Sequence, residues 1–311
     1  MTGFLTDYRR TKFTLPQLMS WDISHGWGEP CDGFEVSFLY TADMLDTLYN
    51  AVEFSAVHEG KTVFSGRVDE YEITADENGL VATVRGRGFG ALLLDNQCEA
   101  AQYGSVGLES ILRNYVTPVG ITRVLTKPMK TVSNFTVSSG SSYWTVLKEF
   151  CRFAGSITPR FSADGVLILD GSGGEDCVID RLTPVTAAVL SDCRYGVVSR
   201  VLVKNKSAGT QQTIDNTPYL SRGALAGRVV NVPRRTGYDA MRFTGQYQIE
   251  NSVAGKRYVE LTLPALFAAF PGDRVSLAYI PMGLYGNYMV CKSRCWADKD
   301  SAGTVLTLEK R

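Results

Sequence analysis

The stretch FSGRVDEYEITADENGLVATVRGRG, residues 64 to 88, decides the fold class. Apolar and polar residues alternate on both sides of Asp76-Glu77-Asn78-Gly79, and Asn-Gly is a strong signal for a β-hairpin. The end of the chain, YGNYMVCKSRCWADKDSAGTVLTLEKR (residues 285 to 311), follows the same plan of a glycine-led long strand, an acidic turn with glycine and a closing strand. We therefore predict two β structures of similar construction within one chain, a pseudo-repeat.

Further strand patterns occur beside both of these stretches. Residues 34–40, 51–58, 62–73 and 80–87 alternate like strands, with a short helical pattern at 42–51, so residues 1–97 are predicted to form a first tube-like antiparallel β-barrel domain. After the flexible joint Gly171-Ser172-Gly173-Gly174, strand patterns return and predict a second such domain over residues 176–311. Its strands are expected at 185–190, 197–204, 257–263, 274–279, 288–296 and 304–308.

The middle of the chain has a different texture. An amphipathic helix is predicted over Ser105 to Val116, and Ser142 is a plausible N-cap for a second helix over Tyr143 to Ala154. With a strand pair at 157–161 and 166–169, residues 98–175 are expected to form a small α/β domain. The fold class is thus mainly β with an α+β insert, two barrels flanking the α/β domain. Within the second barrel we expect a helical and loop insertion around 205–255, with 205–228 an exposed loop and 238–253 a helix.

Composition favours protein partners. The 311 residues include 32 Lys and Arg and 32 Asp and Glu, so no net charge steers the chain toward nucleic acid or an anionic membrane. No apolar run resembles a signal peptide or membrane anchor, and the seven cysteines are scattered and odd in number, unlike a secreted disulfide framework. We therefore expect reduced, mostly buried thiols and a protein made and kept in the cytoplasm of its producing cell.

Residues suited to catalysis are sparse. His25 and His58 lie in turn-like contexts and are expected to be solvated, and no metal-ligand spacing occurs. Cys291 and Cys295 are interpreted as two core-facing thiols of one strand. Glu70 and Glu72 share a strand face, which leaves a hydrolase with a carboxylate pair as a minor alternative. We expect no catalytic residue, no metal and no cofactor, and predict that the chain is not an enzyme.

The first hairpin carries a family resemblance. Phe64 to Asp69, followed by Val84 to Phe89 and then Leu93-Leu94-Asp95, resembles the first barrel of phage tail baseplate hub proteins, the late control protein D family of contractile tails and phage-tail-like particles. This chain has Gly88 where an Asp is common in the family. Residues 143–170 are similar to the family's α/β domain, and 271–275 with 286–290 and 304–308 to its closing barrel.

The resemblance implies a structural hub subunit. Such a subunit forms a homotrimer, a pseudo-hexameric ring that joins the tail tube protein to the central spike protein, with other baseplate and tape-measure proteins as partners and possible DNA passage through the lumen. It would be located in the baseplate of a virion or tail-like particle. The fold-signature and candidate interface residues are Gly66, Arg67, Gly86, Arg87, Gly88, Gly272 and Asp273. The alternative is a carbohydrate-binding tail or adhesion protein that would display Trp21, Trp27, Tyr285 and Tyr288.

Overall fold

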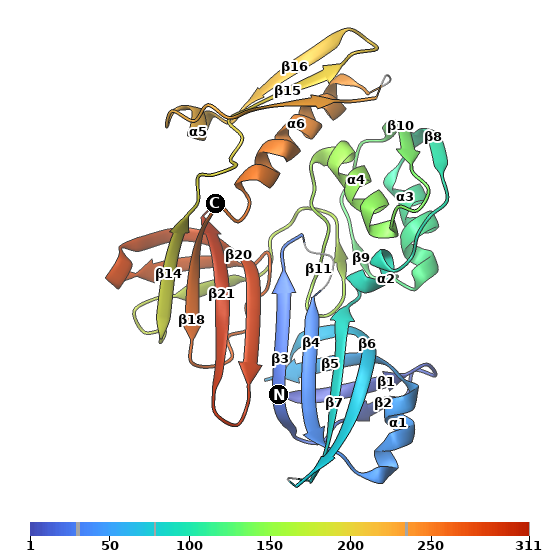
Figure 1. Ribbon diagram of the computed structural model, residues 1–311, viewed down its shortest axis with the longest axis vertical. Coiled ribbons are helices and arrows are strands. Elements are labelled where there is room, and N and C mark those ends of the chain that lie inside the picture. The colour runs from blue at the N-terminus through green and yellow to red at the C-terminus, as the bar shows by residue number, and fades with distance from the viewer. Residues whose placement is uncertain (29–31, 78, 234–235, 311) are drawn as a thin grey trace.

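Two β units occupy one side of the molecule, and two smaller units lie above them (Figure 1). The computed structural model describes residues 1–28, 32–77, 79–233 and 236–310. The predicted fold class is confirmed, because strands predominate and the helices gather in the middle of the chain and in the insertion. In the described part of the chain, no helix is both long enough and apolar enough to span a bilayer.

The first repeat, as we call residues 2–88, contains the opening hairpin. Its elements are β1 Thr2–Asp7, β2 Lys12–Thr14, β3 Leu18–Gly26, β4 Gly33–Leu39, α1 Leu45–Asn50, β5 Ala51–His58, β6 Lys61–Asp76 and β7 Gly79–Gly88. The predicted hairpin is confirmed by the pairing of Asp76 with Gly79, while Asn78 lies outside the described residues. Inward-facing apolar residues of alternate positions, such as Phe34, Val36 and Phe38 on β4, form its core.

The second repeat, residues 176–310 without the insertion, closes the chain. Its strands are β13 Asp176–Ile179, β14 Ala187–Asp192, β18 Arg257–Leu263, β19 Arg274–Tyr279, β20 Leu284–Ala297 and β21 Ala302–Lys310. Its core includes Val259, Leu261, Leu306 and Leu308.

The pseudo-repeat is confirmed by the strand order. Neighbouring strands run β3-β4-β7-β6-β5-β1 in the first repeat and β14-β18-β21-β20-β19-β13 in the second, which is the same permutation of chain order. Both long strands also carry a bulge at the same place, β6 between Val68 and Glu70 and β20 between Val290 and Lys292. One pair departs from the antiparallel expectation, because β13 runs parallel to β19 whereas β1 runs antiparallel to β5.

Between the repeats lies the helical unit with its own core. Its elements are α2 Gly90–Leu94, β8 Ala101–Val106, α3 Leu108–Ile111, a π-helical turn Leu112–Val116, β9 Val124–Leu125, β10 Val132–Val137, α4 Tyr143–Gly155, β11 Arg160–Phe161 and β12 Leu167–Ile168. The Ser142 cap is confirmed, since its Oγ accepts the Thr145 amide at 3.2 Å. The predicted start of the first helix at Ser105 is wrong. Ser105 pairs with Ser133 in the β8·β10 ladder, so the helix begins at Leu108.

The insertion between β14 and β18 corrects a second expectation. Residues 205–228 are not an exposed loop, because a three-stranded sheet of β15 Arg200–Asn205, β16 Thr210–Asp215 and β17 Gly227–Asn231 runs through them, with the short α5 Thr217–Leu220. Helix α6 Tyr238–Val253 is confirmed and covers this sheet through Met241. Gly245 is required in that helix, since a Cβ there would lie 2.5 Å from Ile214 Cδ1.

Candidate assembly interface

The two repeats are joined by strand pairing within the chain. The far half of β20 pairs antiparallel with β3, from Lys292 opposite Gly26 to Ala297 opposite Trp21. One continuous sheet therefore runs from β14 through both repeats to β2, and the two strands lie side by side in Figure 1. Across this junction Asp22 accepts hydrogen bonds from the Arg294 guanidinium, with Nε at 3.0 Å from both carboxylate oxygens. We call the β3·β20 pairing the internal seam.

The internal seam buries apolar groups from both repeats. Ile23 of β3 is fully buried, and Cys295, its partner on β20, packs against the core of the first repeat. Burial raises the pKa of Cys295 to about 12, so that thiol stays protonated and inert. Phe270, from the connection between β18 and β19, also reaches the first repeat, where its ring lies 5.2 Å from that of His25.

His25 corrects the expectation of a solvated loop histidine. It lies on β3 and is buried, with Nε2 3.0 Å from the Val63 carbonyl oxygen and Nδ1 3.2 Å from a carboxylate oxygen of Asp32. The Ser-His-Gly context resembles a turn in sequence, but here it is the end of a strand covered by Phe270. His58, at the end of β5, is partly exposed as expected.

Five of the seven predicted interface residues lie together on the paired strands β6 and β7. Gly66 pairs with Gly88, and Arg67 pairs with Arg87. A Cβ on Gly66 would overlap the Arg87 carbonyl, and a Cβ on Gly86 would overlap the Arg67 carbonyl. Gly66 and Gly86 are therefore required by the close backbone approach of β6 and β7.

The two arginines of this group have partners within the chain. Arg87 forms a bidentate pair with Asp69, at 2.7 and 2.9 Å, and also binds Asp95. The hydrogen bonds from Asp69 and Asp95 raise the pKa of Arg87 and hold it charged. Arg67 lies 3.8 Å from Glu53.

Gly272 and Asp273 lie elsewhere, in the turn before β19. Gly272 has φ +100°, and its carbonyl oxygen accepts the Gly174 amide at 2.7 Å. The buried Asp273 carboxylate accepts the amides of Glu175 and Phe270 at 2.8 and 2.7 Å, and burial raises its pKa. This turn therefore holds the joint 171–174 and the base of the Phe270 connection against the second repeat.

The carboxylates of the hydrolase alternative share one cation. Arg85 Nη1 lies 3.0 Å from Glu70 and 3.3 Å from Glu72, and Arg85 Nε lies 2.8 Å from Glu35. Glu35, Glu70 and Arg85 line a shallow, open hollow on the sheet surface. Two exposed carboxylates that share one guanidinium do not form the acid and nucleophile pair that flanks a scissile bond.

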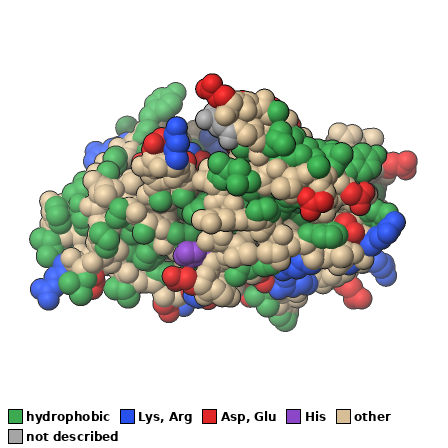
Figure 2. Space-filling model, turned by 90° about the horizontal axis from the view of Figure 1, so that it is seen from below, with side chains coloured by type: hydrophobic (Ala, Val, Ile, Leu, Met, Phe, Trp, Pro, Cys, Tyr) green, Lys and Arg blue, Asp and Glu red, His purple; other side chains and the backbone are tan. Residues whose placement is uncertain are grey.

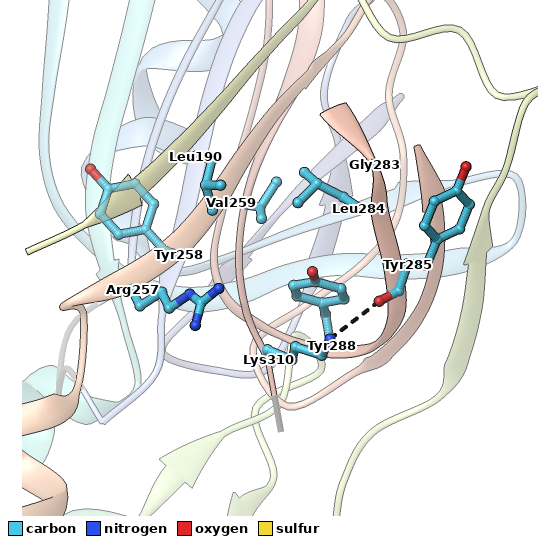
Figure 3. A pocket seen from close by; sticks show the side chains of 9 residues that line it. All are labelled: Leu190, Arg257, Tyr258, Val259, Gly283, Leu284, Tyr285, Tyr288 and Lys310. Atoms are coloured by element: carbon cyan, nitrogen blue, oxygen red, sulfur yellow. Dashed lines mark hydrogen bonds between the residues drawn. The ribbon is translucent and has the colours of Figure 1, made fainter. Parts of the chain in front are cut away.

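The aromatic platform of the carbohydrate-binding alternative does not form. Tyr288 is buried in the second core, Trp21 and Trp27 are partly buried, and of the four rings Tyr285 alone is well exposed, at 53%. Tyr285 and Tyr288 do border a pocket of about 140 Å³ beside Leu190, in which Leu190, Val259 and Leu284 point toward one another (Figure 3). We call it the Leu190 pocket.

Cysteines and acidic residues show no metal-binding arrangement. Among the residues that the structure describes, no group of three or more His, Cys, Asp and Glu side chains is placed to hold a metal ion. As expected, most of the described thiols are buried or partly buried: Cys98, Cys151 and Cys291 are buried and Cys177 and Cys295 partly so. Cys193 is exposed, and Cys31 lies outside the described residues.

The outer edges of the sheet carry apolar residues that sequence analysis missed. Among the described strands, β14 pairs with β18 alone, and Val189 and Leu190 on it are 50% and 43% exposed. The signal was Val189-Leu190 itself, because two consecutive apolar residues in a strand cannot both face one core. In the first repeat, Glu70 to Ala75 of β6 extend past β5 and pair with β7 alone among the described strands.

Known structures share this fold across nearly the whole chain, although no family model and no curated protein matches the sequence. A tail protein from Neisseria meningitidis superposes with a TM-score of 0.77 at 14% identity, covering 99% of this chain and 96% of that one. The 43 kDa tail protein of prophage MuSo2 from Shewanella oneidensis gives 0.70 at 16% identity, covering 99% and 98%.

A third match comes from a secretion system. The E. coli c3393 protein, a type VI secretion component described as similar to T4 bacteriophage tail proteins gp27 and gp5, gives 0.62 at 10% identity, covering 94% of this chain and 73% of that one. The predicted resemblance is thus confirmed at the level of the fold: the chain has the fold of phage tail proteins and of their relative in type VI secretion.

Proposed function

We propose that the chain is a non-catalytic structural subunit of the baseplate hub of a phage tail or tail-like injection particle. Three copies form a pseudo-hexameric ring that joins the tail tube protein to the central spike protein. The observation that carries the proposal is the repeat of one strand order, β3-β4-β7-β6-β5 and β14-β18-β21-β20-β19, in a single continuous sheet. Two similar units per chain allow three chains to match a six-fold tube.

Charge supports protein partners in this role. The chain has no net charge, and acidic and basic side chains are interspersed on the face shown in Figure 2. Tube, spike, other baseplate proteins and the tape-measure protein are the proposed partners, and DNA would pass the lumen without specific binding. The unit boundaries near residues 97 and 175, and an interface role for the glycine and arginine cluster, belong to this proposal. So does assembly in the host cytoplasm before incorporation into the particle.

Mass photometry and negative-stain electron microscopy of the purified chain test the proposal. The expected result is a species of three chains that appears in projection as a ring with six similar units around a channel. Leu225→Ser, in an exposed part of the insertion, is the matched control and should form the same ring. A single-chain species at every concentration, from micromolar to the highest attainable, would contradict the proposal.

A further inference from the structure

The internal seam has an unfilled counterpart at two open strand edges, one in each repeat. Because the two repeats share strand order, β14 occupies in the second repeat the place of β3 in the first, and the far half of β6 occupies the place of the far half of β20. Within the chain, β3 is covered by β20. Strand β14 and residues 70–75 of β6 have no such cover in the described chain.

We propose that β14 of one copy pairs antiparallel with residues 70–75 of β6 of the next copy, in the register of the internal seam. The ring of three is taken from the proposed function; the pairing itself requires only a second copy. Since β14 and β6 are different surfaces, the contact is heterologous and its repetition closes a ring or builds a filament.

The registers within each repeat define the matching positions on β14. Ile23 pairs with Phe34, which pairs with Gly86. In the second repeat Leu190 pairs with Val259, which pairs with Leu308. Leu190 therefore takes the position of Ile23.

The bulges define the matching positions on the long strands. Val68 precedes the bulge opposite Gly86, and Val290 precedes it opposite Leu308. Counting forward from these two valines, Ile73 takes the position of Cys295. Cys295 pairs with Ile23 in the internal seam, so Ile73 of one copy comes opposite Leu190 of another.

Burial at these positions supports the match. Ile23 is fully buried where β20 covers it, whereas Leu190 is 43% exposed at the open edge. An open strand edge with exposed apolar side chains promotes association, and proteins normally protect such edges. The apolar pair Ile73 and Leu190 would remove that exposure in the same way that Cys295 and Ile23 do.

A second contact follows from the connection before β19. Val275 pairs with Tyr288 in the second repeat, and Phe54 pairs with Gly66 at the matching place in the first, so Val275 corresponds to Phe54. Five residues before each of these, Phe270 corresponds to Tyr49 of α1. The preceding residues, Ala269 and Leu48, are both buried in their own cores, which supports the alignment.

Phe270 leaves its own core and packs on the first repeat, whereas Tyr49 is 76% exposed. Tyr49 of one copy is thus placed to pack against the second repeat of its neighbour beside the Leu190 pocket, which is open in the single chain (Figure 3).

Charge at the end of the seam is complementary. The Trp27 amide donates to the Cys291 carbonyl at 2.7 Å, which extends the internal seam by one residue. The same positions in the other repeat are Arg194 and Asp69. The exposed Arg194 of one copy would therefore lie beside the acidic Asp69 and Glu70 of the next.

One native cysteine allows a direct test of the register. Cys193 corresponds to Gly26, and Glu70 corresponds to Lys292. Because Lys292 pairs with Gly26 in the internal seam, Glu70 of one copy should lie opposite Cys193 of its neighbour. In Glu70→Cys, mild copper-phenanthroline oxidation should form a disulfide with the native Cys193 of the neighbour. Burial raises the pKa of Cys177 to about 11 and that of Cys295 to about 12, so these thiols compete poorly. On a non-reducing gel, cross-linked species should stop at three chains.

Matched variants control the position. Thr74→Cys is expected opposite Val189, about 13 Å along the strand from Cys193 at roughly 3.3 Å per residue, and should not cross-link in this way. The triple variant Thr74→Cys, Val189→Cys, Cys193→Ser should form a disulfide between the cysteine introduced at position 74 of one copy and that introduced at position 189 of the next. This variant keeps the ion pair of Glu70 with Arg85, which Glu70→Cys removes. Glu70→Cys with Cys193→Ser should lose the cross-link.

The outcomes separate the two proposals. If the chain forms three-chain particles but neither cysteine pair cross-links, that is, neither Glu70→Cys with Cys193 nor Thr74→Cys with Val189→Cys, the proposed strand pairing is overturned. The hub proposal would then still stand. A covalent ladder beyond three chains would support the seam and overturn the ring of three. A chain that stays single and never cross-links would overturn both.

Discussion

The two repeats place the same strands in the same order but fill their centres differently. In the first repeat Phe34 lies beside Gly86, and the Phe34 ring stacks on that of Phe54 at a centroid distance of 4.3 Å. In the second repeat Val259 lies beside Leu308, both buried. A large ring next to a glycine thus replaces two aliphatic side chains of moderate size. The comparison teaches that one strand order accommodates different core residues at matched positions when their neighbours change with them.

The repeats also differ at their edges. Strand β3 is covered by β20 of the same chain, whereas its counterpart β14 lies open. Strands that hold the same place in the two repeats are therefore an interior strand of the sheet in one repeat and an edge strand in the other. The burial of their side chains depends on whether a second strand pairs with them. Substitutions at matched positions should bring out this difference.

The largest expected effect compares Ile23→Ala with Leu190→Ala. Ile23 is fully buried, so its truncation should lower the free energy of unfolding by about 2–5 kcal/mol. Leu190 is partly exposed in the single chain, so its truncation should change that free energy by roughly 0.5 kcal/mol or less under conditions in which the chain is monomeric. Urea denaturation followed by tryptophan fluorescence measures both. Equal losses would show that β14 is covered within its own chain.

A smaller effect is expected at Gly86, where β6 and β7 approach closely. Gly86→Ala introduces a Cβ that would overlap the Arg67 carbonyl and lie 2.6 Å from Phe34 Cε1, so the backbone must shift, at a cost of about 1–3 kcal/mol. Gly104→Ala, in β8, is the matched control, because nothing lies within 4 Å of the added Cβ. Thermal unfolding followed by circular dichroism compares the two variants. A Gly86→Ala variant as stable as the control would mean that close approach is not the reason for this glycine.

The smallest effect concerns pH and the Arg87 cluster, which the second repeat lacks. The hydrogen bond from Arg87 lowers the pKa of Asp95 below 3.8 in the folded chain. A carboxylate whose pKa is lower in the folded chain than in the unfolded chain stabilises the fold at pH values above its unfolded-state pKa. This stabilisation is lost as the pH falls through the folded-state pKa. The Asp95 side chain is more than half exposed, so the contribution should be under about 1 kcal/mol.

Asp95→Asn measures this contribution. Wild type should be slightly more stable than the variant at pH 6, and the two should converge as the pH approaches 3, in urea denaturation at low salt. Asp298→Asn, in the turn after β20, is a comparison without an arginine partner, since its carboxylate instead accepts the amides of Asp300 and Ser301. A gap between wild type and Asp95→Asn that does not narrow on acidification would argue against the ion pair as its source.

Local sequence patterns predicted most strands and one capped helix. Alternation identified β6 and β7, and Ser142 identified the start of α4, because both signals depend on neighbouring residues. In the insertion, the strand expected at 197–204 is found as β15, although it pairs with β16 and β17 and not with the second repeat. Strand β16 was missed because Thr210–Asp215 is polar apart from Ile214, with little apolar content to reveal a strand. The interface residues were predicted only as a motif. The structure shows close backbone contacts at Gly66 and Gly86, and an interface role for these residues stays a prediction.

The sequence by itself determined the β-rich class and the plan of two similar ends, since alternation and turn residues act over a few positions. Only the tertiary structure decided that β20 crosses to β3, that His25 is buried under Phe270, and that β14 has an open edge. The physical reason is that strand pairing joins residues far apart in the chain, such as Arg294 and Asp22. No local pattern specifies which distant edge a strand will meet.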